Sequence, residues 1–142
     1  MRDIPTVLLV DDNPGDVSLI EQMFEESAID AQLIIARSAS EAFVQLGFNQ
    51  PDAQIRRPDL VILDLNLPVV DGHEILARLR GRADLQDLAI VVLTSSRRPC
   101  DQQLVAPHRV TFVTKPGMWD GYLALGESLK ALLATAPAAK SA

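Results

Sequence analysis

Residues 6–16 read TVLLVDDNPGD, and they set the architecture because they join a buried strand to the start of a helix. The run TVLLV is β-branched and aliphatic without polar alternation, which is typical of a strand buried on both faces of a parallel sheet. Asn13 then offers an N-cap, Pro14 a proline at the first helical position, and Asp16 a carboxylate in the first helical turn. The stretch therefore predicts a strand, a short turn and a helix.

The same strand pattern recurs four more times along the chain, at residues 33–36, 60–63, 90–93 and 110–113. Helical patterns lie between and after these runs, beginning at residues 13 and 38 and covering residues 72–82, 101–106 and 118–133. Ser38 and Glu41 have the spacing of a capping box. The helix at 101–106 is predicted to be short, about two turns, because Pro99 and Pro107 bracket it.

Strict alternation of buried strands and amphipathic helices predicts right-handed crossovers and a parallel sheet covered on both faces. The expected fold class is α/β, a flavodoxin-like (βα)5 doubly wound parallel sheet with strand order 2-1-3-4-5 and an irregular or short fourth helix. We expect one domain over residues 1–134 and a flexible C-terminal tail over residues 135–142, which are rich in alanine. In such a sheet, ligands bind beyond the carboxyl ends of the strands.

The composition disfavours several function classes. Thirteen Lys and Arg against 19 Asp and Glu give a formal net charge of −6, which argues against binding to nucleic acid. No apolar run approaches the roughly 20 residues of a membrane span, and residues 7–10 are too few for a signal-peptide core. Cys100 is the single cysteine, so an internal disulfide cannot form. We expect a cytoplasmic protein with no nucleic-acid or membrane partner.

Polar side chains follow four of the five predicted strands. Asp11 and Asp12 follow the first strand, Asp64 the third, Thr94 the fourth and Lys115 the fifth. Three carboxylates that meet in one crevice repel each other unless a cation shares the site. Because carboxylates and water are the oxygen ligands that Mg²⁺ prefers, the sequence predicts a Mg²⁺ site.

The lysine and the hydroxyl extend this prediction from metal binding to phosphoryl transfer. A divalent cation, an ammonium and a hydroxyl can together neutralise the oxygens of a transferring phosphoryl group. Asp64 ends the central strand and is the candidate nucleophile, which would form an acyl phosphate. Each residue alone has an ordinary structural explanation, such as a helix cap or a turn, but their joint occurrence at four strand ends favours the site.

The chain resembles the response-regulator receiver domain from about residue 6 to residue 133. The motifs that carry the resemblance are VLLVDDNPGD at 7–16, PDLVILDLNLPVVDG at 58–72, VVLTSS at 91–96 and FVTKP at 112–116. The forms DDNPGD and LDLNLP look most like the CheY-like, stand-alone receivers that serve phytochrome-type sensor kinases.

The resemblance implies a role for each residue of the predicted site. Asp64 is implied as the phosphoacceptor, and Asp11 and Asp12 as the acidic Mg²⁺ pair, with Asp12 the direct ligand. Asn66 is implied as a further ligand through its main-chain carbonyl. Lys115 is implied to contact the phosphoryl oxygens, with a cis peptide before the proline that follows it.

The resemblance also implies a switch. Thr94 looks like the hydroxyl that moves to the acyl phosphate, and Phe112 like the aromatic side chain that turns inward as Thr94 moves. Phe112 lacks the hydroxyl of a tyrosine, so any signal it carries is by packing alone. Asn66 and Ser96 match positions that flank the attacking water in this family and tune how long the phosphoryl group lasts.

One stretch departs from the family. Residues 96–110 read SRRPCDQQLVAPHRV, with His108 and Arg109 where receivers usually carry a Gly-Ala turn before the fifth strand. The departure affects the surface through which receivers usually signal to their partners. It does not affect the phosphorylation chemistry of the predicted site. His73 and His108 lack the sequence partners of a metal or catalytic site, and we expect surface or cap roles for both.

The predicted function is that of a single-domain response regulator, not an enzyme acting on other molecules. A sensor histidine kinase of phytochrome-like type would phosphorylate Asp64, and the product would bind a downstream protein or form a homodimer. Three alternatives remain: a phosphorylation-independent interaction module, a flavin-binding protein, and a Mg²⁺-dependent phosphatase with an aspartyl nucleophile. The phosphatase would need a second Asp where Asn66 stands, because an amide cannot transfer protons.

Overall fold

The structure is a computed structural model of the chain, and it describes residues 4–48, 57–65, 67, 72–95 and 99–135. The strands in these residues are β1 Thr6–Val10, β2 Gln32–Ala36, β3 Leu60–Leu63, β4 Ala89–Thr94 and β5 Thr111–Thr114. The helices are α1 Pro14–Glu26, α2 Ala39–Leu46, α3 Gly72–Arg80, α4 Pro99–Val105 and α5 Trp119–Thr135. Two 3₁₀ turns, η1 Ala83–Leu85 and η2 Ala106–His108, follow α3 and α4.

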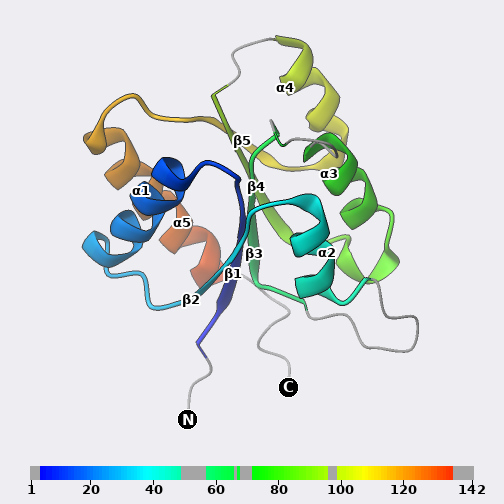
Figure 1. The fold of residues 1–142 in the computed structure, drawn as a ribbon, viewed down its shortest axis with the longest axis horizontal. Helices are drawn as coiled ribbons and strands as arrows, with labels where there is room; N and C mark the ends of the chain where they lie inside the picture. Colours follow the sequence, from blue (N-terminus) through cyan, green and yellow to red (C-terminus); the bar gives the residue numbers. More distant parts are fainter. Residues whose placement is uncertain (1–3, 49–56, 66, 68–71, 96–98, 136–142) are drawn as a thin grey trace.

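The strands form one parallel sheet in the order β2-β1-β3-β4-β5, which confirms the predicted fold class and strand order. Figure 1 shows the sheet between two layers of helices, with α1 and α5 against one face and α2, α3 and α4 against the other. Successive residues of a strand point to opposite faces. In β1, Val7 and Leu9 accordingly pack with α1 and α5, whereas Leu8 and Val10 pack with the other three helices.

Burial of the strands differs between the centre and the edges of the sheet. Every residue of β3 is buried, as the sequence predicts. The edge strands β2 and β5 are only partly buried, so the prediction of five strands buried on both faces is wrong for these two. Their outer sides lack a neighbouring strand, and their short aliphatic runs do not reveal this position in the sheet.

The first two helices begin where the sequence predicts. The side chain of Asn13 accepts a hydrogen bond from the backbone N–H of Asp16 at 3.0 Å. Ser38 Oγ accepts one from Glu41 N–H at 3.1 Å, and Glu41 Oε1 in turn accepts one from Arg37 N–H at 2.9 Å. Caps of this kind stabilise a helix by about 1 kcal/mol each.

The fourth helix confirms the expected short element but begins two residues earlier than predicted. It covers Pro99–Val105, because a proline is tolerated in the first turn, where its missing N–H has no helical partner. The chain continues as η2, and Arg109 ends this turn with left-handed backbone angles, φ 57° and ψ 57°. Helix α3 ends at Arg80, two residues before its predicted end.

At the C-terminal end, α5 continues to Thr135, past its predicted end at residue 133. Residues 136–142 of the predicted tail lie outside the described residues, and the domain boundary at 134 stays a prediction. Among the helices in the described part of the chain, none combines the length and the apolar character that crossing a membrane requires.

Candidate functional site

The carboxyl ends of the strands bring most of the predicted site residues together. Each key residue continues a sheet ladder by one backbone hydrogen bond: Asp11 N–H donates to Ala36 O at 3.0 Å, and Asp64 N–H to Val10 O at 3.0 Å. Lys115 N–H donates to Thr94 O at 2.8 Å. Because these bonds fix the backbone just past the strands, the side chains meet at the carboxyl end of the sheet. This end of the strands lies at the top of Figure 1.

Helix α3 approaches this edge closely because its first residue is glycine. A Cβ atom on Gly72 would lie 2.6 Å from Leu65 Cα, closer than real contacts allow. Gly72 N–H also donates to Leu65 O at 3.0 Å. The glycine therefore lets the start of α3 pack against the backbone that follows Asp64.

Lys115 is the centre of the site. Its Nζ lies 2.6 Å from Asp16 Oδ2, 3.2 Å from Asp11 Oδ2 and 3.2 Å from Asp64 Oδ2. The lysine side chain is only 11% exposed, and those of Asp11 and Asp64 are 2% and 6% exposed. One ammonium thus lies among three carboxylates in a largely desolvated setting. The cluster therefore keeps an excess of negative charge.

Asp16 is the site residue that the sequence analysis missed. It was assigned only to the first turn of α1, where it is the acidic residue. Its carboxylate in fact makes the shortest contact with Lys115. The signal was present, since the turn from β1 into α1 is so short that the first helical turn lies beside the strand end that carries Asp11.

Three carboxylates have the arrangement of a divalent-cation site. One oxygen from each of Asp11, Asp12 and Asp64 lies within 4.8 Å of the others. Ligands opposite each other around Mg²⁺ are about 4.2 Å apart, so these oxygens need only small movements to share one ion. Asp12 is exposed while the other two are buried. The donor set is made of hard oxygen atoms and fits Mg²⁺.

The charges in the site shift the pKa values of two groups. Burial raises the pKa of the Asp11 carboxyl above its ordinary value, although a hydrogen bond from Asn13 N–H at 2.9 Å and the charge of Lys115 oppose the shift. Burial alone would lower the pKa of the Lys115 ammonium, but the hydrogen bond to Asp16 and the charges of Asp64 and Asp11 outweigh it and raise that pKa. The lysine is therefore charged throughout the physiological range.

The two predicted switch residues lie on neighbouring strands. Thr94 is the last residue of β4 and is fully buried. Phe112 lies on β5, where it is partly buried and packs against the core on the α2, α3 and α4 face. Phe112 is paired with Val92 in the sheet, two residues before Thr94 on the same strand.

The remaining expectations from the sequence concern Asn66 and Ser96, the peptide bond before Pro116, and His73. Asn66 and Ser96 lie outside the described residues. The cis peptide expected before Pro116 is wrong, because the described residues contain no cis peptide bond. His73, expected to have a surface or cap role, has Nε2 3.2 Å from the Oδ1 atom of buried Asp101, and this contact joins the start of α3 to α4.

Comparison with known proteins gives matches to one family. The profile of the response regulator receiver domain matches residues 7–121. Response regulator Rcp1 of Synechocystis is 39% identical over 95 residues, which cover 67% of this chain and 65% of Rcp1. The probable methanogenesis regulatory protein FilR2 of Methanothrix harundinacea is 32% identical over 111 residues, which cover 78% of this chain and 71% of FilR2. The matched regions thus leave about a third of each relative uncovered.

Solved structures extend the similarity over most of the chain. The phosphorylated cyanobacterial phytochrome response regulator RcpA superposes with a TM-score of 0.82 at 27% identity, covering 96% of this chain and 98% of RcpA. The Mn²⁺-bound form of Rcp1 superposes with a TM-score of 0.81 at 32% identity, covering 94% of this chain and 99% of Rcp1. The fold is therefore shared with these response regulators.

Proposed function

The chain belongs to the response regulator receiver domain family, and we propose that Asp64 accepts a phosphoryl group from the phosphohistidine of a sensor histidine kinase. The transfer depends on Mg²⁺, and the modified receiver signals through altered protein–protein contacts. The chain is then a signalling protein that catalyses only its own phosphorylation and dephosphorylation.

The observation that carries the proposal is the position of Lys115 beside Asp64. Lys115 Nζ is 3.2 Å from Asp64 Oδ2 and is held there by Asp11 and Asp16. An oxygen of a phosphoryl group that joins Asp64 would come within reach of this ammonium. A fixed cation at the point where negative charge develops is the main way in which proteins assist phosphoryl transfer.

In the proposed reaction, an oxygen of the Asp64 carboxylate attacks the phosphorus atom while the bond from phosphorus to the imidazole nitrogen breaks. The electron pair of the broken bond stays on the nitrogen, and the product is an acyl phosphate. Lys115 binds a phosphoryl oxygen and offsets its charge. Thr94, at the end of the neighbouring strand, supplies a hydroxyl to a second oxygen.

Asp11, Asp12 and Asp64 are the residues that would hold Mg²⁺, together with the main-chain carbonyl of Asn66. When bound, the ion supplies charge neutralisation for the phosphoryl oxygens. The three carboxylates support this assignment by their spacing and by the excess of negative charge that Lys115 leaves.

Phosphorylation would bias an equilibrium between two arrangements of Thr94 and Phe112. Movement of the Thr94 hydroxyl toward the phosphoryl group would open space that Phe112 fills by packing inward. The partly buried position of Phe112 beside the α4 side of the core supports this proposal. The resulting surface change would reach a downstream protein or a second copy of the chain.

The proposed kinase is of the phytochrome type. RcpA is a cyanobacterial phytochrome response regulator, and AtBRR, of 31% identity, is a bacteriophytochrome response regulator. We extend this to the present chain because its acidic and LDLNLP motifs match the same class of receiver.

The proposal is tested by incubating the protein with Mg²⁺ and acetyl phosphate and measuring the intact mass. We expect addition of one phosphoryl group to the wild type and none to Asp64→Asn. Asp30→Asn, which changes an exposed acid in the connection before β2, is the matched control and should be modified like the wild type. Equal modification of the Asp64→Asn variant would overturn the assignment.

A further inference from the structure

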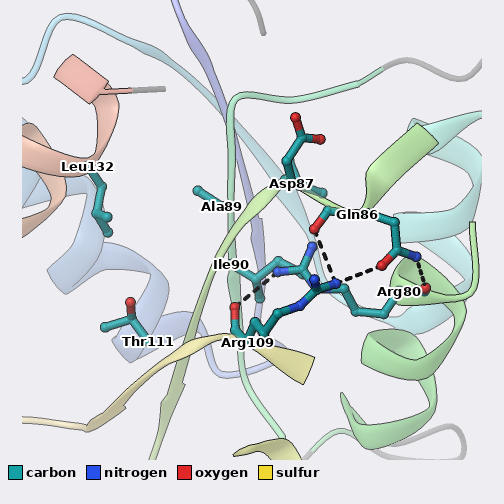
Figure 2. A pocket seen from close by; sticks show the side chains of 9 residues that line it. Arg80, Gln86, Asp87, Ala89, Ile90, Arg109, Thr111 and Leu132 are labelled. Carbon is teal, nitrogen blue, oxygen red and sulfur yellow. Dashed lines mark hydrogen bonds between the residues drawn. The ribbon is translucent and has the colours of Figure 1, made fainter. Parts of the chain in front are cut away.

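A pocket lies at the opposite end of the sheet from the acidic site. It has a volume of ≈ 420 Å³ and is lined by the first residues of β4, by Thr111 at the start of β5, and by residues of α3, of the connection from η1 to β4, of α5 and of the turn that follows η2. Figure 2 shows the side chains of Arg80, Gln86 and Arg109 gathered at this pocket. The pocket is therefore separate from Asp64 and Lys115, which follow the other ends of the strands.

The Arg80 side chain, on α3, forms hydrogen bonds to the end of η1 and to the end of η2 at this pocket. Its Nε donates to His108 O at 2.7 Å, its Nη1 to Leu85 O at 2.8 Å and its Nη2 to Arg109 O at 3.2 Å. All three acceptors are neutral carbonyl oxygens. The guanidinium is thus fixed in place by neutral oxygen atoms and is partly desolvated.

Arg109 brings a second guanidinium to the same place. Its backbone has the left-handed conformation that favours glycine, and its side chain is held by Gln86. Arg109 Nη2 donates to Gln86 Oε1 at 2.6 Å and lies 3.4 Å from Gln86 O. Its Nε and Nη1 donors have no partner in the part of the chain that the structure describes.

The two guanidinium groups form a local excess of positive charge in a chain of net charge −6. Within the described residues, neither Arg80 nor Arg109 has a carboxylate at ion-pair distance. Asp87 also lines the pocket, but its carboxylate is paired with Arg57 at 3.3 Å. Burial, and after it the charge of Arg109, lowers the pKa of the Arg80 guanidinium from its ordinary value, although the charge of Asp87 opposes the shift.

We propose that this pocket binds the phosphate group of a small phosphorylated molecule, with Arg109 as the principal ligand and Arg80 as the fixed second cation. Two guanidinium groups that have no carboxylate at ion-pair distance among the described residues match a phosphate monoester, which carries a charge of about −1.5 to −2 at pH 7. Guanidinium groups bind such oxygens through paired N–H donors. The hydroxyl of Thr111 offers one further donor at the pocket, and Ile90 and Leu132 offer an apolar wall for the organic part.

Occupation of the pocket would act on the connection between α4 and β5. Arg80 already joins this connection to α3 through the carbonyls of His108 and Arg109. Thr111 begins β5, and Lys115 follows the end of the same strand. The pocket and the acidic site can therefore be occupied at the same time, as two separate inputs to one receiver.

The test is isothermal titration calorimetry of the full chain with inorganic phosphate and with phenyl phosphate, at constant ionic strength and without divalent cations. We expect saturable binding of one molecule, tighter for phenyl phosphate because its ring meets the apolar wall. Arg109→Gln should weaken binding at least tenfold, whereas Arg78→Gln, at an exposed arginine of α3 outside the pocket, should not change it. Absence of saturable binding, or equal loss in both variants, would overturn the proposal.

Two further variants separate binding from folding and from the proposed phosphoacceptor. Arg109→Gly suits the left-handed backbone and should keep the fold while losing phosphate binding; wild-type binding by this variant would contradict the proposal. Lys115→Met removes the cation of the acidic site and should still bind phosphate like the wild type, and a loss in that variant would place the phosphate at the acidic site instead. Benzoate should bind more weakly than phenyl phosphate, and tighter binding of benzoate would overturn the assignment to phosphate.

Discussion

The two ends of the sheet carry opposite charges and are assembled in different ways. At the carboxyl end, Lys115 lies among carboxylates that follow β1 and β3 or begin α1. At the amino end, Arg80 and Arg109 lie together without a carboxylate at ion-pair distance among the described residues. The first cluster is placed by the sheet ladders, whereas the second is placed by arginine side chains that bond to carbonyl groups of turns.

Because the two ends are assembled differently, removal of a side chain should have different effects at each end. The backbone at the carboxyl end stays in place without its side chains, because ladder hydrogen bonds hold residues such as Asp11 and Asp64. Loss of a side chain there should change chemistry more than folding. At the amino end the Arg80 side chain itself supplies the hydrogen bonds between segments, so its loss should change folding.

The largest effect is expected for Lys115→Met at the carboxyl end. Removal of the ammonium takes away the cation beside Asp64 and should slow phosphorylation by acetyl phosphate between about 100- and 1,000-fold, the usual loss for one fixed donor. The rate is measured by intact mass over time. Lys130→Met, which removes an exposed lysine paired with Glu127 on α5, is the control and should react at the wild-type rate. A rate for Lys115→Met within a few-fold of the wild type would mean that the ammonium has no part in the transfer.

The next effect is expected for Arg80→Met at the amino end. The variant leaves three carbonyl oxygens without their donor and should lower the free energy of unfolding by about 2 kcal/mol, as for lost hydrogen bonds to a charged group. Urea denaturation measures the change. Arg78→Met breaks an exposed pair with Glu74 and removes a guanidinium that lies 4.8 Å from the centre of the Phe43 ring, and it should cost less than about 1 kcal/mol. Equal losses in the free energy of unfolding for Arg80→Met and Arg78→Met would contradict the structural role of the Arg80 side chain at the amino end.

A smaller, pH-dependent effect is expected for Asp11→Asn. Because the pKa of Asp11 is raised in the folded state, its carboxyl favours folding below its unfolded pKa of 3.8, and this contribution is lost as the pH rises through the folded value. At neutral pH the buried charge is therefore unfavourable, and Asp11→Asn should be more stable than the wild type. The gain should shrink as the pH falls toward 4.

Urea denaturation at several pH values measures this gain. Asp30→Asn, at an exposed acid, should show no comparable change in stability with pH. A variant at Asp11 that is less stable than the wild type at neutral pH, or whose gain grows on acidification, would show that Lys115 outweighs burial at this position.

The smallest effect on stability is expected for Arg109→Gly. Glycine relieves the left-handed backbone of about 1 kcal/mol of strain, while the lost bond to Gln86 costs a similar amount. The free energy of unfolding should stay within about 1 kcal/mol of the wild type. Thermal denaturation of Arg109→Gly beside Arg80→Met checks whether the two arginines differ as the structure indicates, and similar large losses in both would contradict it.

The same difference explains how much could be predicted from the sequence. Strand ends of a parallel sheet converge, so the polar residues after each aliphatic run indicated the cluster of Asp11, Asp64 and Lys115 correctly. Asp16 was missed because its position beside Lys115 depends on the direction in which α1 leaves β1. In the sequence, its role as the acidic residue in the first turn of α1 was already a sufficient explanation for it. The edge position of β2 and β5 was missed because short aliphatic runs look alike at the centre and at the edge.

The amino-end pocket could not be predicted from any local pattern. Arg80 and Arg109 are 29 residues apart in the sequence and meet only through hydrogen bonds from a side chain to turn carbonyls. His108 and Arg109 were recognised as a departure from the family, but the departure alone did not indicate which groups would surround them. A left-handed backbone at an arginine has no signature in the sequence either.

Whether Asp64 accepts the phosphoryl group is decided by locating the modified residue. The protein is phosphorylated with Mg²⁺ and acetyl phosphate, the acyl phosphate is reduced with borohydride, and peptide mass spectrometry finds the aspartate that has become homoserine. We expect reduction at position 64 alone. Reduction at Asp11, Asp12 or Asp16 instead would contradict it.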